Sequence, residues 1–132
     1  MFRFGSTSRD RLATIDDALQ RVLHRAMGYQ LMDFTIVCGH RTQKDQAQAF
    51  SVGASKKEWP NSKHNIFPSI AVDIAPWPID WDDHLAFARL YGIIEAAAAE
   101  EGVPLRWGGD WDRDGESDDQ SFMDIGHFER IE

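Results

Sequence analysis

Apolar residues near the start of the chain recur with the spacing of an amphipathic helix. Between Arg9 and Met27 they fall at intervals of three and four positions, and Gly28 follows where a helix would stop. This spacing predicts a first helix over residues 9–27, with one face packed against a core. The apolar face is formed by Leu12, Ile15, Leu19, Val22, Leu23 and Met27.

Four short stretches have the composition of β-strands. Phe34–Cys38 is apolar and rich in β-branched residues, and residues 70–74 repeat that character before a proline-containing turn. Residues 105–107 and 125–131 are two further candidates. Short runs of this kind, placed between helical segments, predict a small sheet.

Capping residues indicate two more helices. Thr42 can cap a helix that ends at the glycine- and proline-containing loop over residues 53–69. Asp80 or Asp82 can cap a longer, alanine-rich helix that ends before Gly102. A loop as long as 53–69 is usually functional or mobile in a small domain.

These elements together predict an α+β fold, in which a small antiparallel sheet has its helices packed to one side. The chain has 132 residues and 42% hydrophobic content, which suffices for one core but not for two ordinary domains. We therefore expect a single domain over residues 1–132, and a monomer.

The net charge of the chain limits the classes of partner that we expect it to bind. The formal net charge is −8, so we expect neither a generally basic surface nor a nucleic-acid partner. No stretch approaches the roughly 20 apolar residues of a membrane-spanning helix, and the first residues lack the apolar segment of a secretory signal. The sequence thus predicts no membrane insertion and a protein kept soluble in a cytoplasm.

Cys38 is the only cysteine, which excludes an intramolecular disulfide. It lies in the apolar run of the first predicted strand. A buried thiol there acts as a small hydrophobic side chain, and a nucleophilic role is the alternative.

Three polar residues stand where a globular core would not require them, namely His64, Asp73 and His127. Asp73 lies inside an apolar strand, where an unpaired carboxylate is costly unless a cation or hydrogen-bond donors receive it. Two neutral imidazoles and one carboxylate suit zinc and leave a fourth tetrahedral position open, as in catalytic zinc sites. Each residue also has a simpler interpretation: a loop histidine, a strand-end cap, and an edge-strand histidine with a satisfied hydrogen bond.

Four motifs give the chain a family resemblance. They are Ser62-x-His64, Ala71-x-Asp73, Trp107-Gly108-Gly109-Asp110-Trp111 and Asp124-x-x-His127-Phe128-Glu129. Together they resemble the zinc peptidases that include D-alanyl-D-alanine carboxypeptidases, D-Ala-D-Ala dipeptidases and phage L-alanyl-D-glutamate endolysins. The resemblance runs from about Cys38 to Glu129, and it implies the fold of the hedgehog domain and the D-Ala-D-Ala peptidases.

The resemblance implies a role for each residue of the site. It assigns zinc to His64, Asp73 and His127, and the general base to Asp124. Zinc would lower the pKa of its bound water and polarise the scissile carbonyl, while Asp124 takes the proton of the water and passes it to the leaving amine. Asp124 and His127 would lie on opposite faces of an ideal strand, so we expect Gly126 to permit a turn between them.

An arginine motif of the same family resembles the segment Gly39-His40-Arg41-Thr42-Gln43-Lys44-Asp45-Gln46. The resemblance implies that Arg41 holds a substrate carboxylate or stabilises the developing oxyanion. Gln46 and Ser62 are the substrate-binding candidates. A surface arginine at the start of a helix is the alternative for Arg41.

The spacing of the first two ligands departs from the family pattern. His64 and Asp73 are nine positions apart, whereas many members have a shorter gap with a glycine before the alanine. Residues 65–69 enlarge this loop, which leaves its local geometry open.

An acidic run, Asp110-x-Asp112-x-Asp114-Gly115, resembles the start of a calcium-binding loop. The twelfth position, counted from Asp110, is Ser121 instead of glutamate. A solvated acidic turn is therefore the alternative to a calcium site. Bound Ca²⁺ would order the loop before Asp124 and so regulate activity.

The resemblance implies that the chain is a phage endolysin. Such an enzyme would cleave the L-alanyl-D-glutamate bond in the peptidoglycan stem peptide and depend on Zn²⁺. The enzyme would wait in the host bacterial cytoplasm and reach the cell wall after membrane permeabilisation. One alternative is a D-alanyl-D-alanine carboxypeptidase. Another, of a different class, is a non-catalytic zinc-containing binding module; the retention of Asp124 and Arg41 favours an enzyme.

Overall fold

The sheet at the centre of the protein has four antiparallel strands in the order β1-β2-β4-β3. The computed structural model describes residues 1–109 and 124–131. Within them the sheet is formed by β1 (Phe34–Cys38), β2 (Ala71–Pro76), β3 (Leu105–Trp107) and β4 (His127–Arg130). The predicted α+β fold with a small antiparallel sheet is confirmed.

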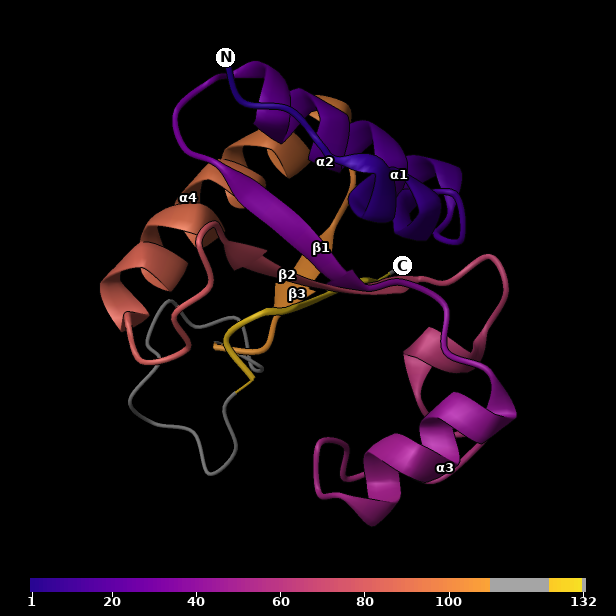
Figure 1. Ribbon diagram of the computed structural model, residues 1–132. Coiled ribbons are helices and arrows are strands. Elements are labelled where there is room, and N and C mark those ends of the chain that lie inside the picture. The colour runs from indigo at the N-terminus through magenta and orange to yellow at the C-terminus, as the bar shows by residue number, and fades with distance from the viewer. Residues whose placement is uncertain (110–123, 132) are drawn as a thin grey trace.

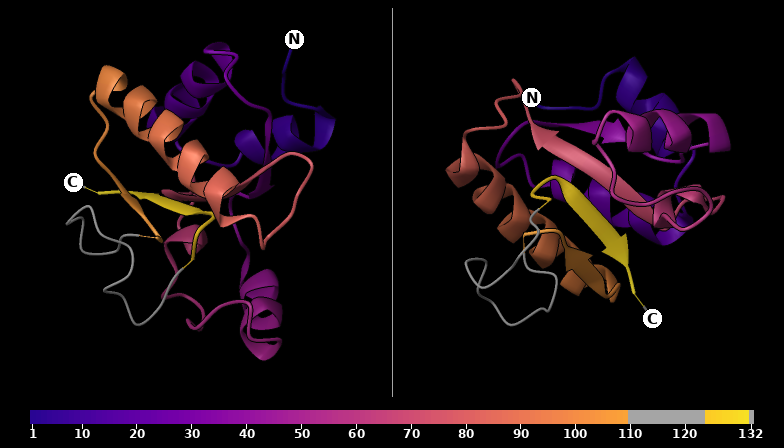
Figure 2. Two further views of the ribbon diagram at one scale, coloured as in Figure 1. Left: turned by 90° about the vertical axis from the view of Figure 1, so that its left-hand side faces the viewer. Right: turned by 90° about the horizontal axis from the view of Figure 1, so that it is seen from below.

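Most of the helical structure lies on one face of this sheet. Figures 1 and 2 show α1, α2 and α4 on that face, whereas α3 lies on the other side. The prediction that the helices share one side thus holds for three of the four α-helices described, and α3 is the exception. The helices are α1 (Ser6–Leu12), α2 (Asp17–Gly28), α3 (Gln43–Ser51) and α4 (His84–Glu101), with a short 3-10 helix, η1, over Lys63–Asn65.

Along the central strands, side chains alternate between the hydrophobic core on one face of the sheet and the candidate site on the other face. Val72 and Ile74 of β2 and Phe128 of β4 are buried in the hydrophobic core under the helices. Side chains of successive strand residues point to opposite faces. Asp73 and His127, which are paired across β2 and β4, therefore point to the face away from this core.

The predicted helix over residues 9–27 is two helices, and the prediction of one is wrong. The break falls at Asp16, whose carboxylate accepts a hydrogen bond from the backbone N–H of Leu19 and caps α2. The same carboxylate accepts from Arg130 at 2.6 Å. The spacing of apolar residues suggests one continuous helix because Ile15, which lies between the two helices, is also buried in the core.

Three other boundaries differ from expectation. Asp83, instead of Asp80 or Asp82, caps α4 through a hydrogen bond from the backbone N–H of Ala86. The last strand begins at His127 because the residues before it form a turn. β2 continues to Pro76, two residues beyond the predicted strand. Among the residues that the structure describes, no helix is long and apolar enough to cross a membrane.

Candidate active site

Three side-chain atoms converge on one point at the open face of the sheet. His64 Nε2 lies 3.2 Å from Asp73 Oδ1, which lies 3.0 Å from His127 Nδ1. The two histidine nitrogens are 3.3 Å apart. We call these three atoms the acceptor triad. They come from η1, β2 and β4, so the longer loop between His64 and Asp73 does not separate them.

Each imidazole of the acceptor triad has its proton fixed on the other nitrogen. His64 Nδ1 donates to the carbonyl oxygen of Gly39 at 2.7 Å. His127 Nε2 donates to the Glu129 carboxylate at 2.9 Å. In the neutral rings His64 Nε2 and His127 Nδ1 are then lone-pair acceptors, and both face a carboxylate oxygen. Three acceptors at this distance require a cation between them.

The dimensions of the acceptor triad fit a metal ion. Bonds of about 2.0 Å in tetrahedral geometry separate neighbouring ligand atoms by about 3.3 Å, close to the three separations here. A carbonyl and a carboxylate behind the two histidines are the usual partners of metal-bound imidazoles. The geometry therefore fits a metal ion held by two nitrogens and one oxygen.

Cys38 offers a second grouping with His64 and Asp73, but its geometry is less suitable. Its Sγ lies 3.9 Å from His64 Nδ1, the nitrogen that already donates to Gly39. The thiol is half-buried instead of fully buried as expected, because a register shift between Ile36 and Cys38 interrupts the regular strand. The acceptor triad therefore fits a metal ion better than the group with Cys38 does.

The protonation of the three side chains in the acceptor triad depends on their contacts with one another and on their burial. Burial opposes protonation of His64, but the adjacent Asp73 carboxylate outweighs it and raises the pKa of His64 to about 10. Burial likewise opposes protonation of His127, and hydrogen bonds to Asp73 and Glu129 raise its pKa above the usual value. Burial would raise the pKa of Asp73, but the two histidines hold it well below its usual range. The acceptor triad thus favours a positive charge. When no metal ion is bound, protons on the histidines supply this charge.

Asp124 stands beside the acceptor triad, as a general base must. Its carboxylate lies within 4.8 Å of the ligand atoms of Asp73 and His127. The turn expected at Gly126 is present, since the backbone N–H of His127 donates to the Asp124 carbonyl at 3.1 Å. Burial, followed by the charge of Asp73, raises the pKa of Asp124, which makes the carboxylate a better proton acceptor.

Gly108 fixes the backbone of Asp124. Its N–H donates to the carbonyl of His127 and its carbonyl accepts from the N–H of Asp124, at 2.8 and 2.9 Å. A Cβ at position 108 would lie 1.9 Å from the Asp124 carbonyl oxygen, so only glycine fits. The Trp107-Gly108 motif thus holds the candidate base in place.

Arg41 reaches the site from the segment before α3. Its Nη2 lies 3.5 Å from Asp73 Oδ2, and its Nη1 donates to Gln46 Oε1 at 2.9 Å. Gln46 is fully buried and also accepts from Asn65 at 3.1 Å. This position favours a role for Gln46 in positioning Arg41, and direct contact with substrate stays a prediction.

The site opens into a cavity of about 530 Å³. Ser62 lines it, and the Ser62 hydroxyl accepts a hydrogen bond from the backbone N–H of His64, so Ser62 shapes η1. Trp81, stacked on Phe87, lines another part of the cavity. Whether Ser62 also contacts substrate stays a prediction.

Glu129 is a further residue of the candidate site, and its role is not indicated by the sequence alone. It is buried, and besides His127 it meets Lys63 at 3.5 Å and Arg106 at 3.4 Å. Burial would raise the pKa of Glu129, but the hydrogen bond from His127 and the two cations lower it. The available signal was its position two residues after His127, on the same face of a strand.

The chain is similar in sequence to known peptidases. A sequence model of the phage L-alanyl-D-glutamate peptidase family matches residues 1–131. The L-alanyl-D-glutamate peptidase of Escherichia phage T5 is 38% identical over 136 residues, covering 98% of each chain.

The chain belongs to the phage L-alanyl-D-glutamate peptidase family. A solved structure supports this membership at the level of the fold. The Serratia marcescens L-Ala D-Glu endopeptidase ChiX superposes with a TM-score of 0.77 at 25% identity, covering 98% of this chain and 90% of that one.

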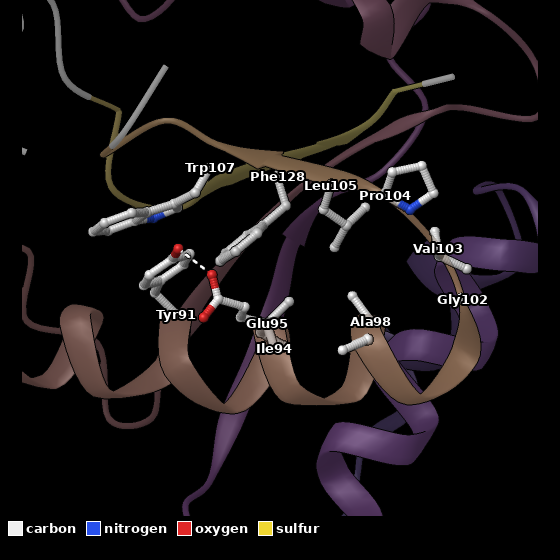
Figure 3. Close-up of a pocket in the computed structure, with 11 residues that line it drawn as sticks. Tyr91, Ile94, Glu95, Ala98, Gly102, Val103, Pro104, Leu105, Trp107 and Phe128 are labelled. Carbon is white, nitrogen blue, oxygen red and sulfur yellow. Dashed lines mark hydrogen bonds between the residues drawn. The ribbon is translucent and has the colours of Figure 1, made fainter. Parts of the chain in front are cut away.

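A second cavity of this peptidase lies apart from the acceptor triad. A cavity of about 510 Å³ between α4 and the β3–β4 edge is lined by Tyr91 stacked on Trp107, with Tyr91 hydrogen-bonded to Glu95 (Figure 3). It shares no residue with the lining of the active-site cavity. The candidate calcium ligands Asp110, Asp112 and Asp114 lie outside the described residues.

Proposed function

We propose that this protein is a zinc-dependent endolysin that hydrolyses the L-alanyl-D-glutamate bond of the peptidoglycan stem peptide. The observation that carries the proposal is the acceptor triad with Asp124 beside it. Zn²⁺ is the ion that two imidazoles and one carboxylate suit best, with a fourth position left for water or substrate. The bond that is cleaved is inferred from the family and the phage T5 relative, because both are named as L-alanyl-D-glutamate peptidases.

Each side chain of the site has a distinct task in this reaction. His64, Asp73 and His127 would hold the zinc ion, which supplies a Lewis acid beside the scissile carbonyl and activates water at neutral pH. Asp124 accepts the proton of the attacking water and returns it to the amine of D-glutamate as the C–N bond breaks. Water thus adds a hydroxyl to the L-alanyl carbonyl carbon and a proton to the leaving nitrogen.

Arg41 supports the same step through its charge. Its guanidinium stands next to Asp73 and lines the active-site cavity. A cation there stabilises negative charge that develops on the scissile carbonyl oxygen, and it costs little reorganisation because Gln46 already holds it.

We also propose a location for this reaction. The enzyme would accumulate in the host bacterial cytoplasm and reach the wall only after the membrane has been permeabilised by another agent. The phage origin of the family and of the T5 relative supports this placement.

The bond that is cut can be identified by mass spectrometry. Purified peptidoglycan is digested with zinc-loaded protein, with and without a zinc chelator, and with the Asp124→Asn variant. We expect new N-terminal D-glutamate only with the active, metal-loaded protein. Loss of terminal D-alanine would instead indicate the carboxypeptidase, and no metal-dependent product would indicate a binding module.

A further inference from the structure

Lysine is rare in this chain and concentrated at the active-site cavity. The sequence contains four lysines in a protein of formal net charge −8. Lys56, Lys57 and Lys63 line the active-site cavity, and the fourth, Lys44, lies on the exposed surface of α3. An anionic ligand approaching an acidic protein would need such a local concentration of positive charge.

The cations that contact the carboxylates of the site include Arg41, Lys63 and Arg106. Arg41 lies 3.5 Å from Asp73, and Lys63 lies 3.5 Å from Glu129. Lys56 and Lys57 belong to an exposed stretch after α3 and also line the cavity. We call these two residues the lysine rim.

A buried side chain holds the lysine rim against the site. The Gln46 amide nitrogen donates to the backbone carbonyl of Lys57 at 2.6 Å and to the hydroxyl of Ser55 at 2.9 Å. The amide oxygen of the same side chain accepts from Arg41. The hydrogen bonds of one fully buried residue thus connect the backbone of the lysine rim to the Arg41 side chain.

The proposed substrate carries a charge that the lysine rim can bind. D-glutamate has two carboxyl groups, and whichever of them continues the peptide, the other remains free as an anion close to the scissile nitrogen. On the catalytic side of the cavity the Asp124 carboxylate would repel this anion, whereas the zinc ion and Arg41 would act on the scissile carbonyl. A carboxylate is therefore best received where the cavity is lined by lysines.

We propose that Lys56 and Lys57 recognise the free carboxylate of the D-glutamyl residue and so determine specificity for it over its amide. This inference rests on the proposed function, since it takes the substrate from there. Lysine provides a point charge with three donors, which suits a carboxylate approached from solvent. The lysine rim thus acts on substrate binding, and Asp124 and the acceptor triad act on the bond itself.

The test uses two peptides that differ at one group. One contains L-alanyl-D-glutamate with its free carboxylate, and the other has that carboxylate replaced by a carboxamide. Values of kcat/KM are measured for wild type, the double variant Lys56→Gln/Lys57→Gln, and the control Lys44→Gln. Binding of both peptides is measured in parallel by calorimetry with the Asp124→Asn protein, with and without the two lysine substitutions.

We expect wild type to prefer the carboxylate peptide by about fivefold, the scale of a partly exposed charge pair. The double variant should lose this preference through a higher KM, in both kinetics and binding, whereas Lys44→Gln should keep it. A double variant that keeps the full preference would overturn the inference. If wild type cleaves neither peptide, the proposed function is wrong. The calorimetry alone then decides whether the lysine rim binds the carboxylate.

Discussion

The two histidines of the acceptor triad present different nitrogens to its centre. His64 presents Nε2 because the Gly39 carbonyl occupies Nδ1, and His127 presents Nδ1 because Glu129 occupies Nε2. Partners of this kind fix the tautomer and orientation of a ligating imidazole and raise its basicity. The groups behind the ligands therefore contribute to metal affinity although they do not touch the metal.

Replacing Glu129 by glutamine tests this role. The amide oxygen still accepts from His127, but the negative charge behind the ring is lost, so we expect zinc affinity to fall by about tenfold. Competition with a chromogenic chelator measures the affinity. Glu58→Gln changes the charge equally on an exposed residue outside the cavity lining and should leave the affinity intact; equal effects of the two substitutions would contradict the assignment.

Metal binding should release protons. In the metal-free protein the pKa of His64, raised to about 10, keeps a proton at the site at neutral pH, and the pKa of His127 is also raised. Zinc must displace bound protons, so its apparent affinity should rise as the pH increases from 6 to 8. Calorimetry in buffers of different ionisation enthalpy should detect release of about one proton or more at pH 7. Binding without proton release would contradict the predicted charge of the site.

At the scale of whole elements, the β3–β4 pair positions the candidate base. Trp107 pairs with Phe128, and the next residue, Gly108, accepts a hydrogen bond from the backbone N–H of Asp124 and donates one to the backbone carbonyl of His127. β4 itself carries His127 and Glu129 on the face of the site. One edge of the sheet thus supplies the base, one ligand and the partner of that ligand.

Alanine at position 108 should separate catalysis from metal binding. Its Cβ would collide with the Asp124 carbonyl and displace the base, so we expect the cleavage rate to fall by about 100-fold or more. The metal content should change less, because Gly108 contacts only the backbone carbonyl of His127 and the ligand atoms of the acceptor triad are side-chain atoms. Gly92→Ala, in α4 with open space around it, is the control and should retain activity. Full activity of Gly108→Ala would show that this contact is unimportant.

The strands could be predicted more accurately than the first helix. Phe34–Cys38 was predicted with the bounds that β1 has, because its apolar run ends at a glycine. The first helix was predicted without its break, because periodicity carries no information about Asp16 turning back to cap a second helix. α3 could not be assigned to the far side of the sheet, since its placement depends on the tertiary contacts of Gln46.

At the scale of the molecule, the sheet divides structural from chemical tasks. Helices α1, α2 and α4 bury one face of the sheet, and the acceptor triad occupies the other (Figures 1 and 2). Sequence motifs named His64, Asp73, His127 and Asp124, and the structure brings these four together. The role of Glu129 and the engagement of Gln46 required three-dimensional contacts, because either residue alone in the sequence is an ordinary polar side chain.

Lysis of whole cells tests the proposed location. Bacteria that express the protein should stay turbid until the inner membrane is permeabilised, for example with chloroform, and should then clear within minutes. Cells that express Asp124→Asn should not clear after the same treatment, because their wall remains intact. Prompt lysis without permeabilisation would contradict a protein that waits in the cytoplasm.

The central claim is that one metal ion at the acceptor triad makes this chain a peptidase, and a zinc titration tests it most directly. Metal-free protein is titrated with zinc while the release of N-terminal D-glutamate from peptidoglycan is measured. We predict no release at the start, a linear rise, and saturation at about one zinc per chain, the stoichiometry of a three-ligand catalytic site. Release by the metal-free protein, or by a His127→Ala variant at the same zinc concentration, would contradict the account.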